Sequence, residues 1–167
     1  MNNELTKKDI EDMEAEIEHR TVVRRKELLE EVKRTRAFGD LSENFEYHAA
    51  KKAKNENESR IRYLERMIRT AKIIEDATGK DEAGVNKSVT VRMENNGQEQ
   101  TFTIVTTVRG DSLKGLISVE SPLGRALMGH VVGDLVHVEV NPEISYDVTV
   151  LSVKDADLKD AGTIQGY

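Results

Sequence analysis

The sequence predicts an α+β protein, with an N-terminal antiparallel coiled-coil hairpin followed by a small antiparallel β domain that carries one short helix. Apolar residues recur with a helical period in the first half of the chain and alternate with a period of two in the second half. No proline precedes Pro122, so nothing interrupts long helices before it. A hydrophobic content of 37% beside 34% charged residues fits an elongated, solvated element next to a compact one.

Residues 1–77 are expected to form the hairpin. The first helical stretch has an interrupted apolar stripe, with a gap at Arg20 and Arg24 between Ile10, Met13, Ile17 and Leu28, Val32. The second stretch has a regular heptad seam, formed by Tyr47, Ala50, Lys54, Asn57, Ile61, Leu64, Ile68 and Ala71. Two helices of about 30 residues joined at Gly39 would be about 45 Å long at 1.5 Å per residue.

Residues 78–155 are expected to form the β domain, entered through a linker rich in Gly, Asp and Asn at residues 77–86. Alternating apolar residues predict strands around 89–93, 102–104, 136–140 and 146–150, and Asn95-Asn96-Gly97 predicts a turn. Residues 121–129 predict a short helix, with Ser121 as N-cap, Pro122 at its first position and Gly129 at its end. Residues 156–167 lack any period and are expected to be a flexible tail.

Composition excludes several functional classes. Cysteine is absent, so there is no thiolate nucleophile or disulfide framework, and the four histidines lack the spacing of metal ligands. No phosphate-binding Gly-Lys loop or nucleophile elbow occurs. The net charge of −6 argues against broad non-specific binding to nucleic acid. The charged N-terminal stretch has no apolar segment of a secretion signal, so a soluble cytoplasmic protein is expected.

The predicted turn of the hairpin, FGDLSENFEY, carries two acidic residues with two possible roles. Asp40-Leu41-Ser42-Glu43 has the spacing of a capping box, which would stabilise the start of the second helix by about 1 kcal/mol. Alternatively, Asp40 and Glu43 are presented at the tip of the hairpin to complete a metal site in another protein. Spacing alone leaves both roles open.

Two segments carry a resemblance to a known family. RTRAFGDLSENFEYHAAKKAKNENESRIRYLERMIRTAKIIED and ISVESPLGRALMGHVVGDLVHVEV resemble the Gre transcript cleavage factors of bacterial RNA polymerase, in the family's order and over roughly residues 5–153. The resemblance implies that the hairpin enters the polymerase secondary channel. It also implies that an FKBP-like C-terminal domain docks on the coiled coil of the largest subunit at the channel rim. The factor would stimulate the polymerase's intrinsic cleavage of backtracked RNA without being an enzyme alone.

The same resemblance implies the site residues. Asp40 and Glu43 match the tip carboxylates, which would help to bind a Mg²⁺ ion shared with the polymerase active site and not held by the isolated protein. Asn44, Phe45 and Tyr47 would shape the tip. The path of the nascent RNA 3' end would be lined by the basic residues Arg34, Arg36, Lys51, Lys52 and Lys54. Polymerase docking would involve Ser121, Pro122 and Leu123, and a monomer that contacts no membrane is expected.

Three other functions stay open at this point. A channel-binding regulator or inhibitor would occupy the polymerase without promoting cleavage. An enzyme that isomerises prolyl bonds is a further alternative for an FKBP-like domain, but its few aromatic residues do not favour a proline pocket. A plain coiled-coil adaptor would explain the heptads and leave the acidic tip without a role.

Overall fold

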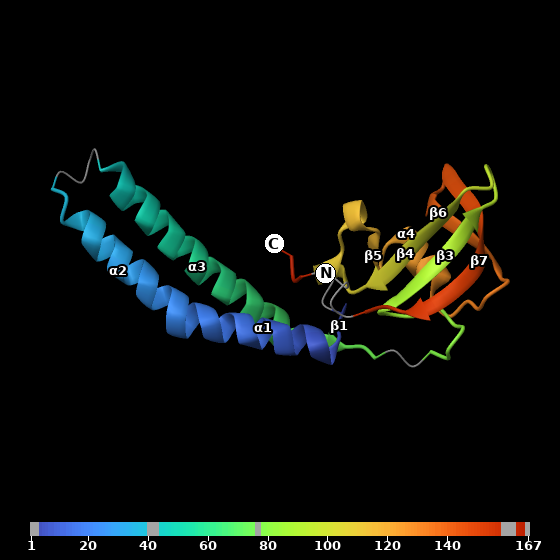
Figure 1. Cartoon of the computed structure of the whole chain (residues 1–167), viewed down its shortest axis with the longest axis horizontal. Coiled ribbons are helices and arrows are strands. Elements are labelled where there is room, and N and C mark those ends of the chain that lie inside the picture. Colours follow the sequence, from blue (N-terminus) through green and yellow to red (C-terminus); the bar gives the residue numbers. More distant parts are fainter. Residues whose placement is uncertain (1–3, 40–43, 76–77, 158–162, 166–167) are drawn as a thin grey trace. The chain divides into compact units, whose positions relative to one another are not determined.

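The structure is a computed structural model that describes residues 4–39, 44–75, 78–157 and 163–165. The chain divides into two compact units, which we call the hairpin unit (Lys8–Ala71) and the body unit (Met1–Lys7 with Lys72–Gly166). Figure 1 shows the paired helices of the hairpin unit and the sheet of the body unit. Composition did not indicate that the first residues of the chain belong to the body unit.

The hairpin unit consists of two long helical segments. The first runs through α1 (Lys7–His19), the π-helical turn η1 (Arg20–Arg24) and α2 (Arg25–Arg36), and the second is α3 (Phe45–Arg69). Arg25 pairs with Glu58, whereas Arg36 near the end of α2 reaches Tyr47 near the start of α3. Residues late in one segment therefore face residues early in the other, which confirms the antiparallel hairpin.

The predicted heptad seam is buried over most of its length. Tyr47, Ala50, Asn57, Ile61 and Leu64 of α3 are buried, and Met13, Leu28 and Thr35 are buried on the first segment. The other predicted positions, Lys54, Ile68 and Ala71, are half-buried. The seam is therefore apolar toward the far end of α3 and contains small and polar side chains toward the tip, as the sequence predicted.

The body unit contains a five-stranded sheet in the order β5-β4-β3-β7-β6. Its strands are β3 (Lys87–Met93), β4 (Glu99–Val105), β5 (Leu116–Ser118), β6 (Leu135–Asn141) and β7 (Ile144–Asp155). All neighbours pair antiparallel except β4 and β5, which pair parallel, so the sheet is mixed rather than wholly antiparallel as expected. The 3₁₀ turns η2 (Thr107–Arg109) and η3 (Ser112–Lys114) connect β4 to β5.

A second, two-stranded sheet brings the start of the chain to the body unit. In it β1 (Glu4–Leu5) pairs parallel with β2 (Lys72–Ile73), and the Ile74 amide donates to the Leu5 carbonyl at 2.9 Å. Segments that are far apart in sequence are therefore joined within the body unit. Strands of two residues carry no detectable period, which explains why the sequence did not predict them.

The segment predicted as a linker is partly core. Ala83 and Val85 are fully buried in the cluster that also contains Val89, Leu127 and Val136. The buried Lys87 ammonium donates to the Thr78 hydroxyl at 2.7 Å and to the Glu82 carbonyl at 3.0 Å, which fastens this segment to β3. Glycine-rich composition therefore misled the prediction for residues 78–86, because the apolar residues among them are too few to show a pattern.

The short helix α4 (Pro122–Leu127) is confirmed, with Pro122 in its first turn. The Ser121 hydroxyl accepts from the Gly124 amide at 3.1 Å, as expected of an N-cap. Gly124 has to be glycine, because a Cβ there would lie 2.1 Å from the Ser118 carbonyl oxygen. Leu123 and Leu127 fix the helix on the sheet by entering the core.

The segment expected to be a flexible tail is described in part. The Ala156 amide donates to the Asn86 carbonyl at 2.9 Å, and the Gln165 amide donates to the Val108 carbonyl at 2.7 Å. These described residues therefore contact the body unit. Among the residues with described positions, no helix has the length and apolar character needed to cross a membrane.

Candidate functional site: the tip of the hairpin

The tip of the hairpin is the link between α2 and α3, residues 37–44. Asp40 and Glu43, the two predicted tip carboxylates, lie outside the described residues, and the flanks of the link are described on both sides. Gly39 has a φ of 105°, a left-handed conformation that glycine adopts without strain.

Asn44 holds both flanks together. Its side-chain oxygen accepts from the Tyr47 amide at 3.0 Å, which makes it the N-cap of α3, and its amide nitrogen donates to the Thr35 carbonyl at 2.6 Å. One side chain thus caps α3 and ties it to the last turn of α2. The interpretation of Asp40 and Glu43 as the capping box of α3 is wrong, because the cap lies four residues after Asp40.

Tyr47 lies between two cations on the inner side of the first turn of α3. It is 6% exposed, and its ring centroid is 5.7 Å from the Arg36 guanidinium and 5.4 Å from the Lys51 ammonium. Arg36 also donates to the hydroxyl oxygen at 3.3 Å. This hydrogen bond, together with the charges of Arg36 and Lys51, lowers the pKa of the Tyr47 phenol from its ordinary value.

Two phenylalanine side chains at the tip face solvent. Phe45 is 84% exposed, and Phe38 is 55% exposed with the Arg34 guanidinium 5.3 Å from its ring centroid. Of the three residues expected to shape the tip, Asn44 and Tyr47 are positioned to do so from within. Phe45 makes no such internal packing, so its ring is available to a partner.

The predicted basic residues differ in how far their charges are already neutralised. Arg34 makes an ion pair with Glu31 through two hydrogen bonds of 3.0 and 2.5 Å, which raises the pKa of the Arg34 guanidinium. The Lys52 ammonium lies 3.9 Å from the Glu56 carboxylate. Among the described residues, Arg36, Lys51 and Lys54 have no ion pair with a carboxylate, and of these Arg36 and Lys51 are exposed whereas Lys54 is half-buried. The positive charge of Arg36 and Lys51 is therefore the most available to an anion.

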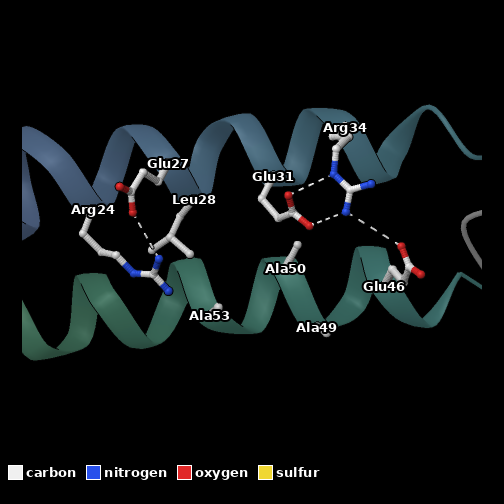
Figure 2. Close-up of a pocket in the computed structure, with 9 residues that line it drawn as sticks. All are labelled: Arg24, Glu27, Leu28, Glu31, Arg34, Glu46, Ala49, Ala50 and Ala53. Carbon is white, nitrogen blue, oxygen red and sulfur yellow. Dashed lines mark hydrogen bonds and ion pairs between the residues drawn. The ribbon is translucent and has the colours of Figure 1, made fainter.

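Arg34 and Arg36 lie on different faces of the hairpin. At 100° per residue, two positions separate their side chains by about 200° around α2. Figure 2 shows the face of Arg34, where a groove of about 560 Å³ runs between the helices. Leu28 and small α3 side chains line the groove, with ion pairs at its two ends; the full lining is Arg24, Glu27, Leu28, Glu31, Arg34, Glu46, Ala49, Ala50 and Ala53. This face carries paired charges, whereas the face of Arg36 and Lys51 carries unpaired positive charge.

The residues predicted for docking are separated by the structure. Ser121 is a helix cap and Leu123 is a core residue, whereas Pro122 is exposed. Pro122 lines a groove of about 330 Å³ between α4 and β6, together with Glu120, Arg125, Ala126, His137, Glu139 and Val140. Sequence reasoning missed the β6 members of this groove, because only the sheet brings them beside α4.

Comparisons with known proteins agree over both halves of the chain. Two family models match, one described as "Transcription elongation factor, N-terminal" over residues 3–73 and one as "Transcription elongation factor, GreA/GreB, C-term" over residues 78–155. The chain is 42% identical over 151 residues to transcription elongation factor GreA of Streptococcus gordonii, covering 90% of this chain and 94% of that protein. It is 44% identical over 151 residues to GreA of Geobacillus kaustophilus, covering 90% and 95%. The solved structure of Gfh1, a GreA factor homolog of Thermus thermophilus, is 26% identical with a TM-score of 0.41, covering 90% of this chain and 97% of that one.

Proposed function

Because the chain belongs to the GreA/GreB family of transcription elongation factors, we propose that it inserts its hairpin into the secondary channel of bacterial RNA polymerase and stimulates cleavage of backtracked RNA. Cleavage leaves a new 3' end that the polymerase extends, so arrested complexes resume transcription. The observation that carries this proposal is the N-cap of α3. Asn44 supplies the cap, so the start of α3 does not depend on Asp40 or Glu43, and a role of these two residues toward a partner is left as the reason for an acidic tip.

The proposed role of Asp40 and Glu43 is to contribute oxygen ligands to a Mg²⁺ ion in the polymerase active centre. Carboxylates are the hard ligands that Mg²⁺ prefers, but the ion takes about six ligands, so two side chains need a partner to complete the site. Such an ion, held about 3.5–4 Å from a second one, supplies an activated water for phosphodiester cleavage. This protein would therefore have no turnover of its own.

Arg36 and Lys51 are the residues best suited to guide the RNA 3' end toward the tip. Both flank Tyr47 near the first turn of α3, and phosphate groups are attracted to cations that are not already paired. Lys54 is half-buried one turn further along α3. Arg34 and Lys52, whose charges are shared with glutamates, are less suited to bind RNA.

Docking at the channel rim is assigned to the groove between α4 and β6. Exposed Pro122 and Val140 provide apolar contact there, and Arg125 and Glu139 provide charges on the same groove. The partner would be the rim coiled coil of the largest subunit. One copy of the protein would act on one polymerase in the cytoplasm, where transcription takes place.

The test is an RNA cleavage assay on stalled, backtracked elongation complexes with labelled transcript. Wild-type protein is compared with the Asp40→Asn, Glu43→Gln double variant, which removes both charges and keeps the shape of the side chains. Because Asn44 supplies the cap of α3, the variant should fold normally. We expect shortened RNA with wild type and only background cleavage with the variant.

Two other outcomes would change the assignment. Equal stimulation by the double variant would show that the carboxylates do not act in cleavage. Slower RNA extension by both proteins, without cleavage, would identify a channel-occupying inhibitor instead. Competition between the variant and wild type for the polymerase provides the control that the variant still binds.

A further inference from the structure

The inward-facing residues of the first helical segment shift by one position halfway along it. The alternating spacing of three and four, continued from Met13 and Ile17, places the next inward positions at 20, 24, 27, 31 and 34. The buried residues are instead Leu28 and Thr35, one position later than this series. The extra residue falls at η1 (Arg20–Arg24), which joins α1 to α2 beside α3 (Figure 1). A π-helical turn accommodates one inserted residue and keeps both parts of the segment facing α3.

Asn57 of α3 binds the first residue of this turn through both ends of its side chain. Its amide nitrogen donates to the Arg20 carbonyl at 3.2 Å, and its oxygen accepts from the Arg20 guanidinium at 3.0 Å. The Arg20 carbonyl also accepts the bond from the Arg25 amide that spans the π-helical turn. Asn57 is only 3% exposed. A buried side chain that is both donor and acceptor therefore recognises the backbone and the side chain of one residue.

Glu16 completes a polar layer around this contact. It accepts from the Arg20 guanidinium at 2.7 Å and from the Arg60 guanidinium at 2.8 Å. Hydrogen bonds require close approach and correct direction, whereas the hydrophobic effect has no direction. The layer is therefore satisfied in one axial alignment of α3 against the first segment.

Between this layer and the tip, hydrogen bonds of Arg25 with Glu58 and of Asn44 with Thr35 also cross between the two segments, but the seam positions Ala50 and Lys54 add little that defines alignment. Ala50 is small and Lys54 is half-buried and charged. A single buried polar residue is known to select register in coiled coils that apolar residues alone leave ambiguous. Sliding by one helical turn would displace a residue by about 5.4 Å along the axis, which exceeds the spacing of about 3.5–4 Å between two catalytic metal ions.

We propose that Asn57 and the π-helical turn at Arg20–Arg24 fix the axial register of the hairpin, and that Asn57 is thereby a positioning residue for the tip carboxylates. The hydrogen bonds of Asn57 and Glu16 carry the inference on register. Its consequence for RNA cleavage rests on the proposed function. The gap in the apolar stripe at Arg20, noted in the sequence, is the counterpart of the polar seam position Asn57.

The register can be measured in the whole protein by pulsed electron paramagnetic resonance, which gives the distance between two nitroxide labels. The chain contains no cysteine, so cysteines introduced at the exposed positions Glu18 and Lys52 would carry the only labels. The residue of α2 opposite Lys52 lies about 13 positions after Glu18, an axial offset of about 20 Å, so the label distance responds directly to sliding. The variants are Asn57→Leu and, as a milder change, Asn57→Ala, with Ile61→Val as the matched change in an apolar seam residue.

Wild type and Ile61→Val should give one narrow distance distribution. Asn57→Leu and Asn57→Ala should keep their helical circular dichroism and show a second population displaced by about one helical turn, about 5 Å. A single wild-type distribution in both Asn57 variants would overturn the proposal. In the cleavage assay, Asn57→Leu should lower the maximal rate in proportion to the displaced fraction in the distance distribution, without changing the half-saturating concentration, because docking is unaltered. If wild type itself fails to stimulate cleavage, the proposed function fails, whereas the distance measurement still decides the register.

Discussion

Replacing Asn44 with alanine should loosen the tip more than a simple capping mutation, because the side chain makes two contacts. Loss of the N-cap bond to the Tyr47 amide costs about 1 kcal/mol. Loss of the bond from the side-chain amide to the Thr35 carbonyl costs about 1 kcal/mol more. The sum of about 2 kcal/mol corresponds to a roughly 30-fold change in an opening equilibrium.

Hydrogen exchange of the first turn of α3 measures this loss directly. The His48 amide, which donates to the Asn44 backbone carbonyl at 3.2 Å, should exchange about 30-fold faster in Asn44→Ala than in wild type. Asn44→Asp is the matched comparison, because a carboxylate keeps the cap acceptor and lacks the donor to Thr35. It should lose about 1 kcal/mol, or roughly fivefold in exchange. Exchange of His48 within twofold of wild type in Asn44→Ala would refute the reasoning.

Three further predictions concern other parts of the molecule. Burial acts to raise the pKa of Glu16, but its two arginine partners outweigh burial and lower this pKa below the ordinary 4.5. The ion pairs of Glu16 therefore stabilise the fold above pH 4.5, and this stabilisation is lost as the pH falls through the lower pKa of the folded state. Melting curves from pH 6 to pH 3 should show a smaller loss of stability in acid for Glu16→Gln than for wild type, and identical profiles would contradict this prediction. Gly124→Ala should destabilise the body unit by about 1–3 kcal/mol in denaturant titrations, because the added Cβ meets the Ser118 carbonyl at 2.1 Å; an unchanged midpoint would show that the loop yields. The double change Arg36→Gln, Lys51→Gln should weaken stimulated cleavage. It should also reduce the slope of the logarithm of the half-saturating concentration against the logarithm of the salt concentration by about 1.4, the value for two lost single-strand phosphate contacts. An unchanged slope would place the RNA elsewhere.

The helices and strands with long, regular patterns could be predicted from the sequence, and the short or irregular ones could not. The seam of α3 keeps an unbroken heptad from Tyr47 to Leu64, and its burial follows the prediction. The three residues of β5 are too few to show a period, and its parallel pairing with β4 depends on contacts across the sheet. The π-helical turn left a visible gap at Arg20, but only the position of Asn57 shows what fills it.

The residue types of the candidate site are visible in the sequence and stay a prediction, whereas the local contacts of its described residues are visible only in the structure. Asp40-Leu41-Ser42-Glu43 has good capping spacing, and Asn44 is an equally good capping residue directly after it, so sequence alone did not decide where α3 starts. Pairing of Arg34 with Glu31 depends on side-chain geometry, so Arg34 and Arg36 were equivalent in the sequence. The burial of Leu123 similarly became evident only from the packing of α4 on the sheet.

The measurement that tests the central claim most directly is the Mg²⁺ dependence of RNA cleavage in backtracked complexes. Cleavage rates are recorded over a range of Mg²⁺ concentrations for the polymerase alone, with saturating wild-type protein, and with the Asp40→Asn, Glu43→Gln variant. If the tip carboxylates hold the ion, wild type should lower the Mg²⁺ concentration needed for half-maximal cleavage, and the variant should return it to the value for polymerase alone. The same half-maximal Mg²⁺ concentration with wild type and variant would contradict a metal-binding role for the tip.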